Sequence, residues 1–564
     1  MTRATAAAGL LAALLWVLLC ARWFDVGWTR PAWLEAIPSA ALAIAVGALF
    51  AFWLRSSWPA LGWSGGGRPL VLTAGLALLF RLPLAWQGGA GYVTPDGALS
   101  GLVALHAREG AERLVFVPHV PYSGSLKSHL AALLSLAVDP ARAFALSSVL
   151  FYALFVAALY RLAVHLREVP GWTALGAGLY AAFAPAFVTR YSLSNDGNYV
   201  EVLALGTLAL VLAVRWAREP ARRGVLAVAL GVVLGVAFWC HILAVIHVAA
   251  VGLFLLLREA KAAVRALPAA GFGFAVGAAP SLLWNAANGW VSFLYLLPGG
   301  TPVGEAAEGP PVGTRLVGLL ADHAPVLLGY DPGYPPALDV AIKTVAFIVL
   351  ALTVAGVAAA ARAALRERCE VLRLLLVLVA VNAAVALWAL PYIPGNPRYL
   401  LFLVAPIAIV LARLLRAPAA RPVFAAVVAF GALGSLAQAP GAVAADGRWR
   451  TFVRDLEREG VRWCYTDFYI GTKVNFLSGE RVVCSSKLGP TTTEYFFAYR
   501  EQVERAPDAA FIAVNSDNAD KLERRLVRLG VTGERRDLMK PVLLRLSRKV
   551  DPSELFPDRA FPLR

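Results

Sequence analysis

Long apolar runs separated by short polar connections dominate the first 440 or so residues of the chain. A membrane-spanning helix needs about 20 mostly apolar residues, and such runs lie near 5–21, 34–54, 69–86, 141–160, 172–189, 199–216, 266–284, 340–361, 373–390, 399–416 and 423–438. The stretch 224–257 is too long for one span, because about 34 residues rising about 1.5 Å each cover about 51 Å against a core of about 30 Å. Splitting it at Cys240-His241 predicts two helices joined by a tight turn, and about thirteen spans in all.

Composition supports a polytopic α-helical membrane protein. Of the 564 residues, 59% are hydrophobic and 16% charged, and the mean hydropathy is +0.66. These values exclude a soluble enzyme, a disordered chain and a fibrous repeat. The first apolar run, Thr5 to Ala21, follows Arg3 and lacks a convincing cleavage site, which favours a retained anchor over a signal peptide.

The positive charges indicate the orientation in the membrane. Lys and Arg residues gather in the short loops of one side, at 55–68, 161–167, 215–223, 258–265, 362–373 and 413–421. Basic loops are typically cytoplasmic, so we expect a bacterial inner-membrane protein with its N-terminus inside and its C-terminal tail outside. The same loops account for the net charge of +16 without a nucleic-acid partner.

This topology places two large loops and a tail on the outer side. Loop 87–140 contains two short amphipathic stretches that should lie along the membrane interface, and loop 285–337 is rich in Gly and Pro. The tail 441–564 has the pattern of a small α/β domain. We expect helices at 450–459 and 519–529 and strands at 461–465, 481–485, 510–514 and 542–546. Cys464 and Cys484 lie in this domain, either as a disulfide or as two free thiols.

Three acidic residues lie near the predicted outer surface. Asp96 follows the third span, Asp196 lies between the fifth and sixth spans, and Glu201 begins the sixth. Taken singly, Asp96 and Asp196 suit turns in which a carboxylate bonds its own backbone. Two carboxylates on one face could instead supply a general base and its partner or a metal ligand. A carboxylate as deep as Glu201 is costly unless it has a function.

Basic and aromatic residues on the same face could bind an anion. Lys127 and Tyr122 lie in the first outer loop, where Lys127 either contacts an anion or anchors an interfacial helix. His241, in the turn of the split span, is either a binding residue or a hydrogen-bonded core histidine. Arg398 and Tyr392 lie in the outer turn 391–399, where the arginine could clamp a phosphate or anchor a helix end.

Residues 69–440 resemble the GT-C glycosyltransferases, which use polyprenyl-phosphate sugars and include protein O-mannosyltransferases and lipid A aminoarabinose transferases. The resemblance rests on an aspartate at the head of a long outer loop (Asp96 and 97–137), a second carboxylate at Asp196, the second large loop at 285–337, and the run Asn396-Pro-Arg-Tyr-Leu-Leu. Tyr122–Lys127 lies where such enzymes often contact the carrier phosphate. An acidic pair at position 96 is absent, and the two spans in 1–68 are extra to the shared core.

The resemblance implies transfer of a sugar from a polyprenyl-phosphate carrier to an acceptor glycan, lipid or protein on the outer face. Asp96 would act as general base, basic groups would hold the phosphate, and Asp96 with Asp196 could bind a divalent cation. No nucleotide-sugar motif is visible, because Gly65-Gly66-Gly67 lacks the required strand and spacing. The alternatives are a transporter or lipid-linked-sugar flippase without catalysis, and a scaffold that acts through the tail.

Overall fold

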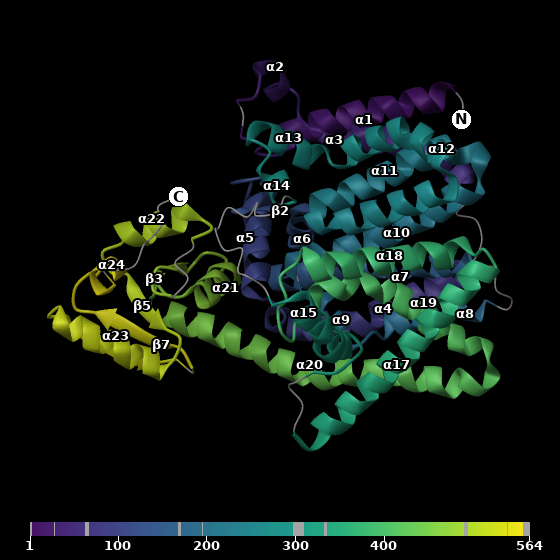
Figure 1. Ribbon diagram of the computed structural model, residues 1–564. Coiled ribbons are helices and arrows are strands. Elements are labelled where there is room, and N and C mark those ends of the chain that lie inside the picture. Colours follow the sequence, from purple (N-terminus) through teal and green to yellow (C-terminus); the bar gives the residue numbers. More distant parts are fainter. Residues whose placement is uncertain are drawn as a thin grey trace.

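The computed structural model describes residues 3–27, 29–61, 67–166, 171–194, 196–296, 310–331, 336–489, 494–538 and 540–556. Within these ranges nine helices are long and apolar enough to cross a membrane, and they lie side by side in one bundle (Figure 1). They are formed by α4 (Gly67–Gly88), α7 (Pro140–Val164), α10 (Tyr199–Arg218), α11 (Arg223–Cys240), α12 (Val245–Gly277), α17 (Pro336–Arg366), α18 (Glu370–Trp388), α19 (Val404–Ala412) and α20 (Arg421–Arg458) with their flanking turns. Shorter apolar stretches lie in α1 (Arg3–Trp23) and α3 (Ser39–Leu61). The predicted polytopic fold is confirmed, whereas the count of thirteen spans stays a prediction.

The long apolar stretch 224–257 divides where the sequence predicted. Helix α11 ends at Cys240, and His241 is extended (φ −163°, ψ 139°). The 3₁₀ turn η4 (Ile242–Ala244) follows, and α12 begins at Val245. Helix α12 itself contains a non-helical residue, Glu259, that divides it into two legs. In the second leg, Gly273 and Gly277 approach the backbone of α11 so closely that any β-carbon would collide with a carbonyl oxygen. This close approach is possible because glycine has no side chain.

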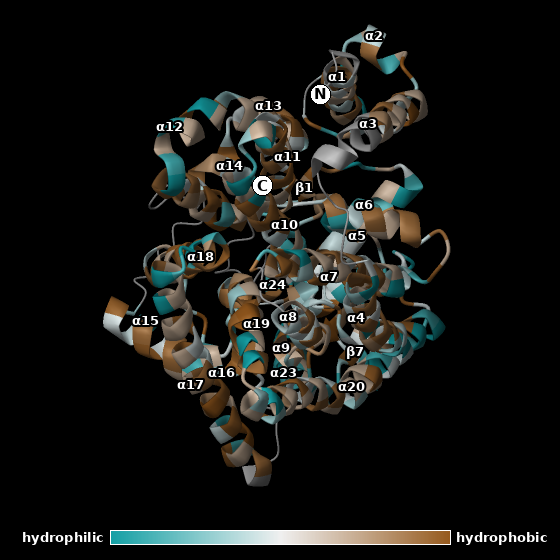
Figure 2. Cartoon of the chain, turned by 90° about the vertical axis from the view of Figure 1, so that its right-hand side faces the viewer, coloured by the Kyte–Doolittle hydropathy of each residue, from teal (hydrophilic) through white to brown (hydrophobic). Residues whose placement is uncertain are grey.

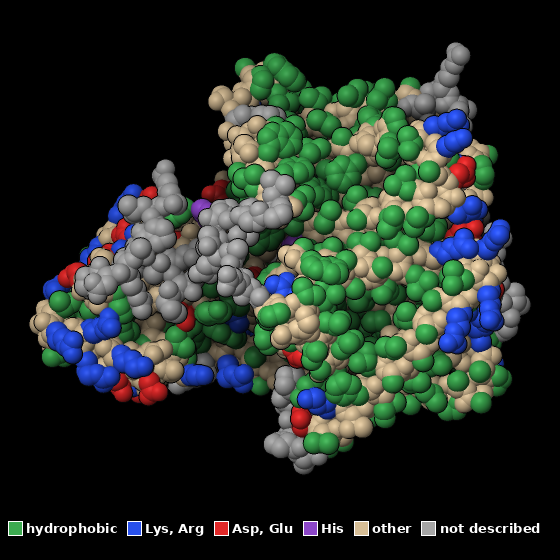
Figure 3. Space-filling model, in the orientation of Figure 1, with side chains coloured by type: hydrophobic (Ala, Val, Ile, Leu, Met, Phe, Trp, Pro, Cys, Tyr) green, Lys and Arg blue, Asp and Glu red, His purple; other side chains and the backbone are tan. Residues whose placement is uncertain are grey.

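Ion pairs connect the helix ends on one side of the bundle. Arg218 and Arg258 both pair with Glu370, at 3.0 and 3.7 Å, and Arg223 pairs with Glu259 at 2.5 Å. These contacts join α10, α11, α12 and α18 at the end where the basic loops gather. Figure 3 shows blue basic side chains along this right-hand edge and a largely hydrophobic surface next to it. Figure 2, viewed from this end, shows mostly hydrophobic helices throughout the bundle.

The predicted span 172–189 is broken into α8 (Trp172–Ala182) and α9 (Ala186–Tyr191). The break frees backbone carbonyls, and side chains from neighbouring helices satisfy them. The fully buried Arg81 donates to Ala182 O at 2.7 Å, and Tyr152 donates to Ala181 O at 2.8 Å. The Arg81 guanidinium also lies 3.8 Å from the centre of the Tyr152 ring. An interrupted helix within a membrane requires such replacement donors.

The first large loop, 87–140, folds as α5 (Pro95–Glu109), the hairpin β1 (Phe116–Val117) and β2 (Val120–Gly124), and α6 (Leu126–Leu134). Both predicted helices are confirmed, whereas the hairpin was not predicted. Helix α5 lies across the end of the bundle (Figure 1). It is buried on all sides from Gly97 to Leu105, because α21 (Phe468–Ser478) of the C-terminal domain packs over it. The sequence predicted that this helix lies along the membrane interface. In the structure, part of its surface is covered by protein as well.

The C-terminal domain contains a five-stranded sheet in the order β4-β3-β5-β7-β6. Strands β4, β3 and β5 are parallel, and β7 is antiparallel to both of its neighbours. The strands are β3 (Trp463–Tyr465), β4 (Val483–Ser485), β5 (Ala510–Ala513), β6 (Gly533–Asp537) and β7 (Val542–Leu546), and the helices include α22 (Phe497–Arg505) and α23 (Ser516–Arg528). The four predicted strands are confirmed, and β6, α21 and α22 were not predicted. Cys464 and Cys484 stand opposite each other on β3 and β4 and form a disulfide.

Helix α20 continues without interruption from the bundle into this domain (Figure 1). Its 38 residues merge the last predicted span with the predicted charged helix at 450–459. Contacts with the end of the bundle that carries α5 hold its second half. Asp446 accepts a hydrogen bond from the Ala90 backbone N–H at 2.7 Å, and Arg450 pairs with Asp139 at 3.0 Å.

Candidate functional site

The hairpin strand β2 lies directly against the C-terminal end of α11. Ser123 forms an isolated antiparallel bridge with His241, and a β-carbon on Gly124 would collide with the Trp239 carbonyl oxygen. This packing brings Tyr122, on β2, next to His241, with ring centres 5.5 Å apart. The Tyr122 ring also lies 4.7 Å from that of Tyr295. Two residues that the sequence singled out separately are therefore neighbours.

Asn198 fastens this arrangement to α10. The short turn η2 (Asp196–Asn198) holds Gly197 and Asn198 at φ +58° and +55°, a conformation that glycine and asparagine tolerate best. The buried Asn198 amide donates to Ser123 Oγ at 3.1 Å, to Gly124 O at 2.5 Å and to Cys240 O at 3.0 Å. Sequence reasoning missed this residue, and the Asp-Gly-Asn turn before an apolar run was its one available signal.

His241 and Arg398 share a cluster of aromatic side chains. The Tyr199 ring lies 5.3 Å from His241 and 6.2 Å from Tyr399. Arg398 Nη2 donates to the Tyr399 hydroxyl at 3.0 Å, and its guanidinium lies 5.0 Å from the centre of that ring. The buried Nε of Arg398 has no hydrogen-bond partner among the described residues. A buried guanidinium with spare donors can bind an anionic ligand.

The protonation of His241 follows from its surroundings. Burial, followed by the nearby positive charge of Arg398, lowers the pKa of His241 to about 3. The imidazole is therefore neutral at physiological pH. Because Nδ1 accepts a hydrogen bond from the Leu243 backbone N–H at 3.1 Å, we assign the ring proton to Nε2. His241 thus offers one neutral N–H donor.

Tyr392 contacts residues of the second large loop and supports the turn that carries Arg398. Its ring stacks on His323 with centres 4.6 Å apart, and its hydroxyl donates to Asp322 at 2.8 Å. Asp322 also accepts from the Gly395 backbone N–H at 2.8 Å. Asp322 and His323 belong to the π-helical turn η5 (Leu319–His323) of the second large loop, 285–337. Residues 297–309 and 332–335 of that loop lie outside the described residues.

Lys127 and Glu201 form a buried ion pair. The Lys127 ammonium lies 3.3 Å from the Glu201 carboxylate, and their side chains are 1% and 0% exposed. The pair joins the first turn of α6 to the first turn of α10. Neither Glu201 oxygen accepts a hydrogen bond from any described residue. The buried negative charge is therefore compensated mainly by the Lys127 ammonium.

Asp96 is exposed in the first turn of α5. Thr94 caps this helix by accepting a hydrogen bond from Gly97 N at 3.0 Å, and Pro95 is its first residue. The aspartate therefore belongs to a helix N-terminus, which favours a negative charge, and not to the open turn that its neighbours predicted. Helix α5 packs against η2. The backbone of Asp196 begins η2, but its side chain lies outside the described residues.

The C-terminal domain approaches the same region through an aromatic segment. Tyr495 and Phe497 pack edge-on against His119 in the β1–β2 turn, with ring centres 6.2 and 5.1 Å away. Burial, then the nearby charge of Asp96 and then Tyr295, raises the pKa of Tyr495. Tyr495 therefore lies close to both Asp96 and the aromatic cluster, although nothing in the sequence linked it to them.

A second contact fastens the domain to α5. His106 contacts Glu480 at 2.8 Å and Glu112 at 3.2 Å. Burial alone would lower the pKa of His106, but the two carboxylates outweigh it and raise the pKa to about 9. The imidazolium thus links α5 to the turn that follows α21.

No group of three or more His, Cys, Asp or Glu side chains in the described ranges is arranged to hold a metal ion. In the described part of the site Asp96 lies near Tyr495, and its predicted partner Asp196 is placed by its backbone alone. The predicted sharing of a cation by these two aspartates stays a prediction.

No family model and no curated protein sequence matches this chain. Among solved structures, it is similar to ArnT from Cupriavidus metallidurans bound to undecaprenyl phosphate, with a TM-score of 0.56 and 13% identity over 84% of this chain and 97% of that chain. The apo state of the same protein gives a TM-score of 0.56 and 13% identity, over 86% and 98%. An oligosaccharyltransferase from Archaeoglobus fulgidus gives a TM-score of 0.49 and 14% identity, over 78% and 67%. The chain therefore has the membrane fold of ArnT along nearly the whole length of that protein, which is the fold that the predicted resemblance implies.

Proposed function

We propose that this protein is a glycosyltransferase that moves a sugar from a polyprenyl-phosphate carrier to an acceptor at the outer face of the bacterial inner membrane. The observation that carries the proposal is Arg398, a largely buried guanidinium with a spare Nε donor at one end of the bundle. The fold supports it as well, because ArnT was crystallised with undecaprenyl phosphate. In this proposal the basic loops face the cytoplasm, and the C-terminal domain lies outside.

The carrier phosphate would bind at Arg398. Its guanidinium can form charge-assisted hydrogen bonds with phosphate oxygens, and the surrounding tyrosines keep bulk water away, which strengthens them. The Nε2–H of His241 is a second donor toward the same phosphate, and the Tyr122 and Tyr199 rings next to it would flank the ligand. Tyr392 contributes by holding the turn that carries Arg398.

Lys127 and Glu201 have a different role in this proposal. The sequence suggested that both residues contact substrate, and the contact of Lys127 with phosphate stays untested. The buried ion pair supports a positioning role, because it joins α6, which follows β2 in the chain, to α10, which follows η2. We therefore assign the pair to the support of Tyr122 and Asn198.

Asp96 would be the general base. Its carboxylate is exposed at the positive end of α5 and can accept the proton of an acceptor hydroxyl. As the proton moves to Asp96, the acceptor oxygen bonds to the anomeric carbon. The bond from that carbon to the phosphate oxygen breaks, and its electron pair leaves with the phosphate at Arg398. Direct displacement inverts the anomeric centre.

The acceptor would approach between α5 and the C-terminal domain. Tyr495 lies near Asp96 on this side, so its phenol is suited to contact the acceptor. Asp196, on the adjoining turn η2, would orient the acceptor or share a divalent cation with Asp96. Such a cation would neutralise negative charge at the phosphate. The acceptor proton would still be taken up by the Asp96 carboxylate.

The proposal is tested with purified protein and synthetic polyprenyl-phosphate sugars. We expect release of free polyprenyl phosphate in an acceptor-dependent reaction, and loss of that release in Asp96→Asn. A flippase would move labelled donor between the leaflets of a vesicle without releasing polyprenyl phosphate. Movement without release, for every donor and acceptor class tried, would contradict the proposal.

A further inference from the structure

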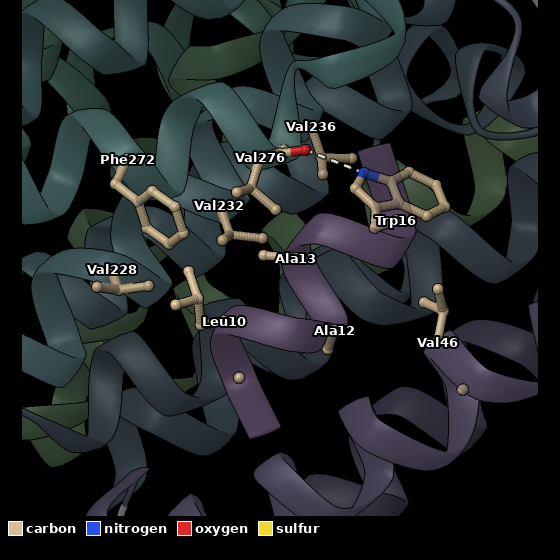
Figure 4. A pocket seen from close by; sticks show the side chains of 13 residues that line it. Leu10, Ala12, Ala13, Trp16, Val46, Val228, Val232, Val236, Phe272 and Val276 are labelled. Carbon is tan, nitrogen blue, oxygen red and sulfur yellow. Dashed lines mark hydrogen bonds between the residues drawn. The ribbon is translucent and has the colours of Figure 1, made fainter. Parts of the chain in front are cut away.

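A cavity separates the N-terminal helix pair from the rest of the bundle. Helices α1 and α3 pack against each other and form an edge of the molecule (Figure 2). Between this pair and α11 and α12 lies a space of about 440 Å³. Figure 4 shows side chains from all four helices pointing toward it. Its lining consists of Gly9, Leu10, Ala12, Ala13, Trp16, Val46, Gly47, Val228, Val232, Val236, Phe272, Val276 and Gly277.

The chemistry of the cavity excludes water as its natural content. Among these thirteen described residues, the indole N–H of Trp16 is the one polar side-chain group. It already donates to the Val276 carbonyl at 3.0 Å (Figure 4). A buried water needs two to four polar partners, and apolar cavities stay dry. The space therefore suits hydrocarbon.

The position of the cavity supports an elongated occupant. On α11 its lining extends from Val228 to Val236, which is about 12 Å along the helix. On α1 it extends from Gly9 to Trp16, about 10 Å. The cavity thus follows the helix axes over about a third of a hydrocarbon core of about 30 Å. Leu10 and Phe272, which line it, are 51% and 44% exposed, so the space borders the lipid-facing surface.

Two features separate this cavity from the proposed donor site. Helix α11 stands between the cavity and α10, which carries Tyr199 of the aromatic cluster. A buried group that includes Trp239 and Phe24, with Trp16 packed against it, closes the outer end. A carrier whose phosphate sat at Arg398 would have to pass its tail through this packed protein. A chain from the surrounding bilayer can enter from the side.

We propose that this cavity binds one acyl chain of a membrane phospholipid. The chain fills the space between α1, α3, α11 and α12 and seals the N-terminal helix pair to the core. The site is separate from the proposed glycosyl transfer, and its test does not depend on that activity.

Filling the cavity from the protein side provides the test. A β-carbon on Gly47 would meet no atom within 4 Å, so Gly47→Leu can project into the cavity without a backbone clash. Gly271→Leu is the matched control, because Gly271 also has open space around it but is exposed and does not line the cavity. Ala13→Leu fills the same space from α1 and serves if Gly47→Leu fails to fold.

The full-length protein is reconstituted in phosphatidylethanolamine–phosphatidylglycerol vesicles that contain a phosphatidylethanolamine with a photoactivatable acyl chain. Mass spectrometry then maps the labelled peptides. We expect labelling of the segments around Ala13 and Val232. We expect labelling of these segments to fall about tenfold in Gly47→Leu or Ala13→Leu, because the added side chain and the acyl chain would overpack the same space. Labelling in Gly271→Leu should stay at the wild-type level.

Two results would overturn the proposal. One is labelling of the cavity segments that persists at the wild-type level in both filled variants. The other is capture of a photoactivatable polyprenyl phosphate at those segments with displacement of the phospholipid probe, which would assign the cavity to the carrier tail.

Discussion

Removal of Lys127 tests the buried ion pair most directly. Lys127→Met replaces the ammonium with an apolar chain of similar length and leaves the Glu201 carboxylate fully buried. That carboxylate has no hydrogen-bond donor among the described residues to replace the lost partner. We therefore expect a large loss of stability even though one side chain changes.

The magnitude follows from the geometry of the pair. At 3.3 Å and an effective dielectric constant of about 20, the attraction is about 5 kcal/mol. Taking both ions out of water costs several kcal/mol each, so the intact pair adds little net stability over an apolar pair. Breaking a buried pair typically costs about 3–5 kcal/mol. The double variant Lys127→Met/Glu201→Leu should recover most of that loss.

Unfolding in detergent, followed by scanning fluorimetry and by denaturant titration, measures these differences. Arg505→Met is the control, because Arg505 pairs with Glu501 while both side chains are exposed, at 80% and 57%. Exposed pairs contribute about 0–1 kcal/mol, so this variant should be nearly unchanged. An unaltered Lys127→Met, or a double variant as unstable as the single ones, would refute the reasoning.

Donor affinity in the double variant then distinguishes positioning from direct contact. We expect the Lys127→Met/Glu201→Leu protein to bind the carrier phosphate nearly as tightly as wild type, because its support of the hairpin is restored. Weak donor binding in a folded, stable double variant would instead mean that the ammonium itself contacts phosphate.

Further variants test the other parts of the structure. Asp96→Asn should lower transfer by at least about 100-fold while donor binding and melting temperature stay close to wild type; near-normal turnover would disprove its role as base. Arg398→Ala should raise the KM for donor by about 10- to 100-fold, as expected for a lost charge-assisted hydrogen bond, with a smaller effect on kcat. Since the pKa of His106 is raised to about 9 from its usual value near 6.5, its contribution to stability should be full below about pH 6.5 and vanish as the pH rises through 9. His106→Gln should abolish that part of the pH dependence of melting. A cysteine at Pro310 should react with a membrane-impermeant reagent added outside, and one at Glu219 should not; the reverse pattern would invert the topology.

Local pattern predicted most of the elements of this fold. The stretch 224–257 could be divided at Cys240 because its length exceeds the thickness of the membrane. The strands of the C-terminal domain could be found because each is a short apolar run bounded by turn residues. The β1–β2 hairpin escaped because Pro118 and Pro121 interrupt its alternation, and strand β6 escaped because most of its residues are exposed and charged.

The candidate site depended on contacts that a sequence pattern does not contain. Lys127 and Glu201 were each identified as unusual, but the two residues of the pair lie 74 positions apart in the chain, on different helices. Asn198 was overlooked because its three hydrogen-bond partners come from β2 and the end of α11. Tyr495 approaches Asp96 only because the C-terminal domain folds back over α5. Distance along the chain hides each of these relationships.

Because α20 is unbroken, the orientation of the C-terminal domain relative to the bundle depends on the number of residues in this helix. A helix advances about 100° and 1.5 Å with each residue, so inserting one residue between Asp446 and Arg450 would rotate the whole domain by about that angle relative to the bundle. Arg450 would turn away from Asp139, and Glu480 would be carried away from His106. An insertion of four residues, about one full turn, would nearly restore the direction but lift the domain by about 6 Å. The helix therefore sets both the direction in which the domain presents Tyr495 and its height above the membrane surface. The length of this segment can change only in whole turns if the direction of the domain is to be kept.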